Sequence, residues 1–301
     1  MIKIIKALKF YILQLGKDIF FSKKKSAILI KEVEHLSTFS DSEYVKLRNL
    51  KYRTLSSSIY PIFKLFSKIT KISLDFFVID LREKNPELFT LNRCDKSLYK
   101  KIQIEANIRK LDRGTTGKEE LIKPIVDNFV NDHIVSSQDH IKGVCMGARN
   151  GSEVIAFEKM LDKALKKMKL LPTVNVIGTD ISPSATLFPN MIVHDFHETL
   201  PENIGQVDFI YSNSLDQSNN PKKALSAWID SLTPCGVIYL DYSSRNGKQS
   251  FSMLDPFSCE IELFPFVFLK WMSGKAFIQK AIFREEIPNS ATFVIKKISN
   301  I

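Results

Sequence analysis

IKGVCMGARNGSEV (residues 141–154), VNVIGTDIS (174–182) and MIVHDFHETLP (191–201) are the three segments that decide the fold of this chain of 301 residues. Each opens with a short apolar run of the length of a buried β-strand. The first run ends in a glycine-rich turn, the second at Asp180 and the third just before Asp195. In an open parallel sheet, ligands bind outside the carboxyl ends of the strands. The turn and the two carboxylates are therefore predicted to face one crevice.

The sequence from residue 141 to residue 242 alternates between strand-like and helix-like periodicity. The predicted strands cover residues 141–146, 174–178, 191–193, 207–212 and 237–242, and the predicted helices cover residues 152–168 and 221–232. Residues 233–236 (TPCG) are predicted to form the turn into the last of these strands. Strands that alternate with helices predict an α/β fold with a doubly wound parallel sheet.

The C-terminal tail departs from this alternation. Residues 276–284 and 291–298 are strand-like runs separated by only six residues. Parallel strands need a crossover of about a dozen residues or more, so these two runs must form an antiparallel hairpin. The sequence therefore predicts a Rossmann-like, seven-stranded, mostly parallel sheet with an antiparallel C-terminal hairpin in residues 131–301. A mainly helical region, residues 1–130, is predicted to precede it.

The positive charge of the chain is concentrated at its N-terminus. Residues 1–72 hold 15 Lys/Arg and 5 Asp/Glu, whereas the remainder holds 28 of each kind. Enzymes of nucleic acids carry basic side chains beside the site, so the neutral C-terminal part disfavours a DNA or RNA substrate. Residues 1–21 have lysines on one side of a helical wheel and apolar residues on the other. Both a helix on an anionic membrane surface and a helix packed on a core fit this pattern.

Two local features complete the N-terminal half. Thr116 and Glu119 have the spacing of a capping box and open a predicted helix through residue 130, with Pro124 inside it. Because this helix precedes the first strand, we expect it to cover the crevice. Four cysteines are scattered without a CxxC pair, which predicts neither a disulfide framework nor a zinc site. We expect a cytoplasmic protein, with peripheral contact at the inner membrane surface if residues 1–21 form an interfacial helix.

The residues around the crevice predict the kind of ligand. The glycines of the turn let backbone approach a ligand, and the following helix offers free N–H groups to a carboxylate. The spacing G-x3-G-x3-G differs from the G-x-G-x-x-G dinucleotide fingerprint. A tight turn without a ligand also explains it. Asp180 suits ribose hydroxyls, unless it caps the next helix, a role that Ser182 fills equally well. Asp195 suits an adenine amine, so an adenosyl group without phosphate is predicted.

These segments, together with VDFIYSNSLDQSNNPKKALSAWIDSLTPCGVIYLDYS (207–243), resemble the class I S-adenosylmethionine-dependent methyltransferase family. The resemblance implies S-adenosyl-L-methionine as the cofactor and methyl transfer as the reaction. It implies that the methionine part lies against Gly147, Ala148, Arg149 and Gly151, the ribose against Asp180 and Ile181, the adenine against Asp195 and Phe196, and the methyl group against Ser212, Asn213 and Ser214. The chain is identified as a divergent member, since Cys145 replaces a usual acidic residue, Arg149 a usual glycine, and Cys235 a glycine of the later turn.

Methyl transfer from a sulfonium requires alignment of donor and acceptor and, for a hydroxyl acceptor, removal of a proton. Asp216 is the candidate base because it follows the fourth predicted strand, although a solvated loop carboxylate fits equally well. His194 is a second candidate and His197 a lesser one. Residues 194–197 (HDFH) hold too few convergent ligands to predict a metal site.

The interpretation that we take forward is methyl transfer to a hydroxyl of a small molecule or a glycan. Asn213 lacks the Asn-Pro-Pro-aromatic context of enzymes that methylate nucleic-acid amines, so a nucleic-acid partner is not expected. Arg149 and Cys145 motivate an alternative, a non-catalytic S-adenosylmethionine-binding module. A nicotinamide-dependent oxidoreductase or epimerase is a third interpretation, which the glycine spacing and the final hairpin disfavour.

Overall fold

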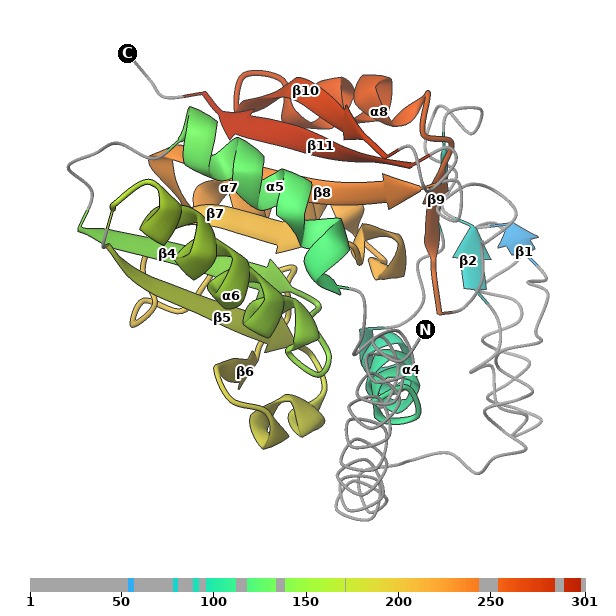
Figure 1. Ribbon diagram of the computed structural model, residues 1–301. Coiled ribbons are helices and arrows are strands. Elements are labelled where there is room, and N and C mark those ends of the chain that lie inside the picture. The colour runs from blue at the N-terminus through green and yellow to red at the C-terminus, as the bar shows by residue number, and fades with distance from the viewer. Residues whose placement is uncertain are drawn as a thin grey trace, which may run out of the picture.

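The computed structural model of the protein describes residues 54–56, 78–80, 89–91, 96–111, 118–133, 139–170, 172–243, 254–284 and 290–298. The predictions for residues 1–21 and for Thr116 lie outside these ranges. Figure 1 shows a central twisted sheet with helices on both of its faces.

The main sheet consists of β4 (His140–Met146), β5 (Thr173–Asp180), β6 (Met191–Val193), β7 (Val207–Ser212), β8 (Leu232–Ser243), β10 (Ala276–Phe283) and β11 (Ser290–Lys297). Their spatial order is β10-β11-β8-β7-β4-β5-β6. All neighbours from β6 to β8 are parallel, whereas β11 runs antiparallel to both β8 and β10. The predicted sheet and its reversed final hairpin are confirmed. Because the chain order reverses at β4, the ligand crevice of such a sheet is expected beside the end of this strand.

The turn predicted at residues 233–236 is wrong, because these residues belong to β8. Leu232 already pairs with Val207 of β7, and pairing resumes between Val237 and Phe209. Between these two pairs, β8 contains five residue steps and β7 only two. The additional residues of β8 form a bulge near the start of the strand, which begins directly after α7 (Pro221–Asp230).

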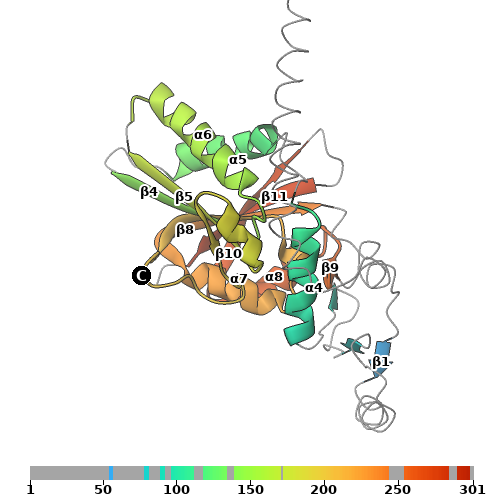
Figure 2. The same cartoon turned by 90° about the horizontal axis from the view of Figure 1, so that it is seen from below.

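Helices cover both faces of the sheet (Figure 2). α5 (Lys118–Asp132) and α6 (Ser152–Lys167) pack on one face, where their apolar side chains join Phe209 and Tyr239 in one core. α7 and α8 (Phe264–Met272) pack on the other face around Trp228. Each helix buries the apolar stripe that its three- and four-residue spacing creates, so the sheet is desolvated on both sides.

The element that covers the crevice is α4 (Lys96–Ile108), not α5 as the sequence predicts. α5 lies along α6 on the sheet face, and Figure 1 shows α4 beyond the carboxyl ends of the central strands. The reason is packing: buried residues 122, 125, 126, 129 and 130 of α5 need an apolar partner, and the sheet face supplies it.

The described residues of the N-terminal 91 form three short strands. β1 (Thr54–Ser56) pairs in parallel with β2 (Val78–Asp80), and β3 (Phe89–Leu91) pairs antiparallel with β9 (Phe257–Cys259). Two 3-10 turns, η2 (Pro183–Leu187) and η3 (Leu215–Gln217), follow β5 and β7. The pairing of β3 with β9 joins the chain before α4 to the C-terminal part.

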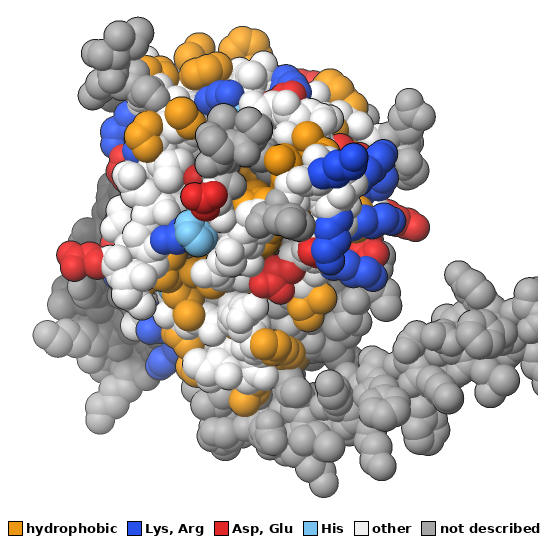
Figure 3. All heavy atoms as spheres, turned by 60° about the vertical axis from the view of Figure 1, so that its left-hand side comes forward, with side chains coloured by type: hydrophobic (Ala, Val, Ile, Leu, Met, Phe, Trp, Pro, Cys, Tyr) orange, Lys and Arg blue, Asp and Glu red, His pale blue; other side chains and the backbone are white. Residues whose placement is uncertain are grey.

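The surface is mixed in charge. Figure 3 shows acidic side chains among the basic ones on one face. Several lysines of α5 and α6 are neutralised by exposed ion pairs: Lys123–Asp127, Lys159–Glu119 and Lys166–Asp162. Within the described ranges, the helices are too short or too polar to span a bilayer.

Candidate functional site

The glycine turn after β4 bends sharply through three left-handed residues. Gly147, Arg149 and Gly151 have φ values of 73°, 47° and 70°. Such values are unstrained chiefly for glycine, so the left-handed backbone of Arg149 costs this residue about 1–2 kcal/mol. The N–H of Ala148 donates to the carbonyl of Thr179 at the end of β5, at 2.9 Å. The turn is therefore held directly against the strand that carries Asp180.

Asp180 lies at the end of β5 and is 4% exposed. One carboxylate oxygen accepts from Asn107 Nδ2 and from the N–H of Ser182, both at 2.8 Å, and the other accepts from the N–H of Arg149 at 3.1 Å. Burial raises the pKa of Asp180, and these hydrogen bonds counteract the rise. Ser182 caps η2 by accepting from the N–H of Ser184. As the sequence allowed, Asp180 is thus not needed as the side-chain cap of this 3-10 turn.

Asp195 follows β6 and is held by a histidine. Its Oδ1 accepts from the backbone N–H of His197 and lies 2.7 Å from His197 Nδ1. The other ring nitrogen of His197 lies 2.7 Å from Ser218 Oγ. Partial burial raises the pKa of Asp195, but the hydrogen bonds from His197 outweigh it and hold the pKa at about 2. Asp195 is therefore ionised at neutral pH and able to accept hydrogen bonds.

Phe196 lies beside it as an apolar wall. Its carbonyl accepts from the indole N–H of Trp228 at 2.9 Å, and its ring stands edge-on to that indole with centroids 5.8 Å apart. The Asp195–Phe196 pair is therefore fixed from the face of the sheet that α7 covers.

Three side chains of α4 complete the site and were not found from the sequence. Tyr99, Gln103 and Asn107 are spaced by four residues and share one face of the helix. The Tyr99 hydroxyl donates to the carbonyl of Gln217 at 2.9 Å, and Gln103 Nε2 donates to the carbonyl of Leu254 at 2.8 Å. Asn107 also accepts from Arg149 Nε at 3.3 Å. The polar spacing was the available signal, although its partners lie far away in the sequence.

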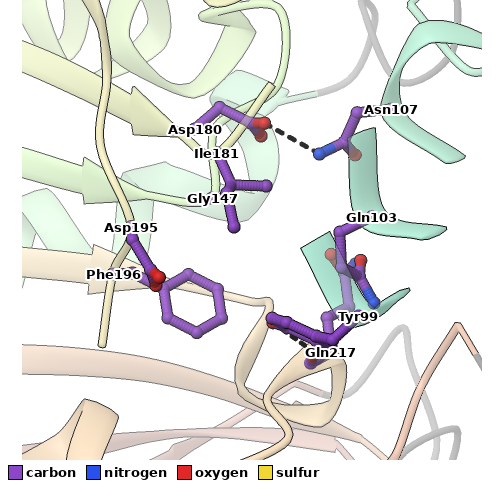
Figure 4. A pocket seen from close by; sticks show the side chains of 9 residues that line it. All are labelled: Tyr99, Gln103, Asn107, Gly147, Asp180, Ile181, Asp195, Phe196 and Gln217. Carbon is purple, nitrogen blue, oxygen red and sulfur yellow. Dashed lines mark hydrogen bonds between the residues drawn. The ribbon is translucent and has the colours of Figure 1, made fainter. Parts of the chain in front are cut away.

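These residues surround one hollow (Figure 4). Its lining consists of Tyr99, Gln103, Asn107, Gly147, Asp180, Ile181, Asp195, Phe196 and Gln217. Of the predicted cofactor-binding residues, the hollow is lined by Gly147, Asp180, Ile181, Asp195 and Phe196, whereas Ala148, Arg149 and Gly151 of the turn are not in its lining. The hollow has a volume of about 10 Å³, roughly the space of a single water molecule. With α4 in this position, the hollow is too small for an adenosyl group.

Residues 212–214, at the end of β7 and directly after it, do not line the hollow. Ser212 is buried and donates to the carbonyl of Met146, whereas the exposed Asn213 lies 3.5 Å from Glu153 Oε1. Ser214 packs against the turn, so that a Cβ on Gly147 would come within 2.8 Å of the Ser214 Cβ. The structure does not place Ser212 or Asn213 in the lining of the hollow.

The two candidate catalytic side chains also lie outside the lining. Burial and the Asp255 carboxylate raise the pKa of Asp216, and its Oδ1 is buried without a hydrogen-bond partner. A raised pKa favours the protonated form of this carboxyl group and makes its ionised form a stronger base. His194 Nε2 lies 3.1 Å from the carbonyl of Glu198. Both assignments stay predictions.

Metal ligands do not gather at this site. Across the part of the chain that the structure describes, no three His, Cys, Asp or Glu side chains are arranged to hold an ion. His197 instead uses both ring nitrogens on Asp195 and Ser218.

The chain resembles known proteins in the fold of its backbone and not in its sequence. No protein-family model and no curated protein sequence matches the chain. Similar solved structures include a pericyclic reaction enzyme, with 13% identity and a TM-score of 0.43, over 57% of this chain and 46% of that chain. Loganic acid methyltransferase with SAH has 11% sequence identity and a TM-score of 0.42, and the match covers 56% of this chain and 73% of that chain. The glycopeptide N-methyltransferase MtfA with S-adenosylmethionine has 8% sequence identity and a TM-score of 0.42, and the match covers 60% of this chain and 93% of that chain.

Proposed function

We propose that the hollow is an S-adenosylmethionine site and that the protein transfers the methyl group to a hydroxyl of a small molecule or a glycan. The single observation that carries this proposal is convergence. Gly147, Asp180 and the Asp195–Phe196 pair come from the ends of three adjacent parallel strands and line one hollow. Each offers what one part of the ligand needs: close backbone, an acceptor for ribose hydroxyls, and an acceptor beside an apolar wall for adenine.

The chemistry follows from these parts. When bound, S-adenosylmethionine supplies an electrophilic methyl group on a sulfonium. The side chains of this protein would hold the nucleoside by Asp180 and Asp195 and orient the methionine part along the turn at Gly147. α4 would exclude water when it closes, and alignment of donor and acceptor is the main contribution that such a site makes to the rate.

The choice of acceptor rests on charge. The exposed lysines of α5 and α6 named above are already paired with carboxylates, and residues 73–301 have no net charge. A polyanionic acceptor would gain little long-range attraction from a region without net charge. The hollow is lined by amide, hydroxyl and aromatic groups from α4, which suit a neutral polar acceptor.

Binding is tested by the thermal stability of the wild-type protein and of Asp180→Ala with S-adenosylmethionine. A true binder gains about 2.7 kcal/mol at a ligand concentration one hundred times the dissociation constant. We expect this gain in the wild type and its loss in Asp180→Ala. The matched control is Asp162→Asn, an exposed carboxylate on α6 paired with Lys166, which should behave as the wild type. No gain in the wild type, or an equal gain in Asp180→Ala, would contradict the proposed site.

Transfer is tested with labelled methyl donor and separate fractions of small molecules, cell envelope, protein and RNA. Label in the small-molecule or envelope fraction is the expected result, and label in RNA alone would contradict the acceptor class. A second candidate function is a non-catalytic S-adenosylmethionine-binding module. It is favoured by one observation, that neither Asp216 nor His194 lines the hollow. Binding without transfer to any fraction would support it.

A further inference from the structure

The side chain of Asn107 is hydrogen-bonded to the carboxylate of Asp180, which is the group that we propose binds the ribose hydroxyls. Its side-chain amide donates to Asp180 Oδ1 at 2.8 Å, and both residues are more than nine-tenths buried. Figure 4 shows Asn107 on α4 pointing across the mouth of the hollow at Asp180. The two N–H groups of Ser182 and Arg149 take further acceptor positions of the same carboxylate. A carboxylate has about four such positions, so little capacity is left for two ribose hydroxyls.

The same helix is fixed at two further points. Tyr99 and Gln103, two turns and one turn before Asn107, donate to the carbonyls of Gln217 and Leu254. Beyond Asn107, the carbonyl of Leu111 accepts from Asn150 Nδ2 at 2.9 Å. Side chains from one face of α4 and the segment after it are therefore bonded to the turn after β4, to β5, to η3 and to residue 254. With α4 in this position the hollow has a volume of only about 10 Å³.

We propose that Asn107 is an internal competitor of the nucleoside and that it sets the affinity of the site. This inference rests on the proposed function. In the closed state the Asn107 amide takes the place of a ribose hydroxyl on Asp180, and ligand binding requires that this hydrogen bond open. The affinity observed for a ligand falls by the fraction of molecules in the competent state. Weakening the Asn107–Asp180 hydrogen bond alone therefore strengthens ligand binding, the opposite of what a ligand-contacting residue does.

The test compares Asn107→Ala with the wild type and uses S-adenosylhomocysteine as the unreactive probe. A hydrogen bond to a carboxylate is worth about a factor of ten or more in an equilibrium constant. We expect Asn107→Ala to bind the probe about tenfold more tightly in isothermal titration. Hydrogen exchange without ligand is the second readout, and the amides of α4 should exchange about tenfold faster in the variant.

Lys101→Ala is the matched control, because Lys101 is exposed on the same helix and makes none of the bonds that anchor it. It should leave both the exchange of α4 and the affinity as in the wild type. A gain in affinity from Lys101→Ala equal to that from Asn107→Ala would mean that the bond to Asp180 does not set the affinity, and the inference would fall.

The remaining outcomes separate this inference from the proposed function. If the wild type binds and Asn107→Ala binds equally or more weakly, the competitor role is refuted and the cofactor site stands. If neither protein binds the probe while α4 exchanges faster in the variant, the closed helix is real but the cofactor assignment fails, and the competitor role fails with it.

Discussion

Gly143 sits in β4 directly opposite Phe209 of β7, and a methyl group there should be poorly tolerated. A Cβ on Gly143 would lie 2.0 Å from Phe209 Cζ and 2.3 Å from its Cε1. The ring has no room to retreat. Phe209 is 1% exposed and packs between Phe129 and Phe157, with ring centroids 5.0 Å and 5.1 Å away.

Overpacking of a core usually costs about 1–3 kcal/mol, and this overlap involves the rigid end of a ring. We therefore expect Gly143→Ala to lower the free energy of unfolding by about 3 kcal/mol. Phe209→Ala alone should cost about 4 kcal/mol through the cavity that it leaves. In the double variant the new methyl group enters that cavity. The double variant should therefore cost about the same as Phe209→Ala, not the sum of about 7 kcal/mol.

The assay is denaturation by urea followed by circular dichroism for the wild type, both single variants and the double variant. Gly274→Ala is the control for adding a methyl group without a steric overlap, because a Cβ on Gly274 would meet nothing within 4 Å. We expect this variant to lose only about 1 kcal/mol, because alanine is unfavourable at the φ of 77° found there. Additive effects of Gly143→Ala and Phe209→Ala would refute the pairing of β4 with β7 in this register. That register also aligns the strand ends from which the glycine turn and Ser214 emerge.

Three further predictions concern stability. Lys169 lies just after α6 with a φ of 59°, in the position where helices favour glycine. Lys169→Gly should therefore raise the free energy of unfolding, measured by urea titration, by about 1 kcal/mol. A lower free energy of unfolding in this variant would contradict the prediction. Arg284→Met should destabilise by about 3 kcal/mol, because it leaves Asp241 charged and largely buried; the exposed Lys166→Met should change the same measurement by less than about 0.5 kcal/mol. Burial and the nearby Lys296 lower the pKa of His133 to about 4 from 6.5. As the pH falls, His133 therefore becomes protonated in the unfolded chain before it does in the folded protein, so the free energy of unfolding falls between pH 6.5 and pH 4. After allowance for the partial exposure of His133, we expect this fall to be about 2 kcal/mol. His133→Phe should remove this part of the pH dependence, and an unchanged dependence would refute the assignment.

The strands and their ends were predictable because the signal is local. The apolar runs before Gly147, Asp180 and Asp195 are short and are bounded by turn residues, and parallel strands bring such ends to one edge. The short connection between residues 284 and 291 likewise excludes a crossover. The sequence also showed Arg149 at a position where the family that it resembles usually has a glycine, without predicting the left-handed backbone found there. It did not reveal that the Arg149 guanidinium would bond to α4.

The cover of the site was not predictable for a different reason. The side chains of α4 bond to residues 73, 118 and 151 positions later in the chain, and no local pattern encodes such partners. The sequence contained the four-residue spacing of Tyr99, Gln103 and Asn107, but polar residues at that spacing are equally typical of a solvated helix face. The surroundings of Asp216 were not predictable either: it follows β7 as expected, but its burial and its raised pKa depend on neighbours that only the folded chain supplies.

The pairing of β3 with β9 has a consequence for biosynthesis. On a ribosome, the strand Phe89–Leu91 emerges long before its partner Phe257–Cys259, and Gln103 must await the carbonyl of Leu254. Synthesis runs at about 5–20 residues per second. β4, β5 and β6 are thus translated seconds before Leu254. A nascent chain passes through an interval in which Asp180 and Asp195 have been synthesised while the anchor of α4 at Leu254 has yet to be made.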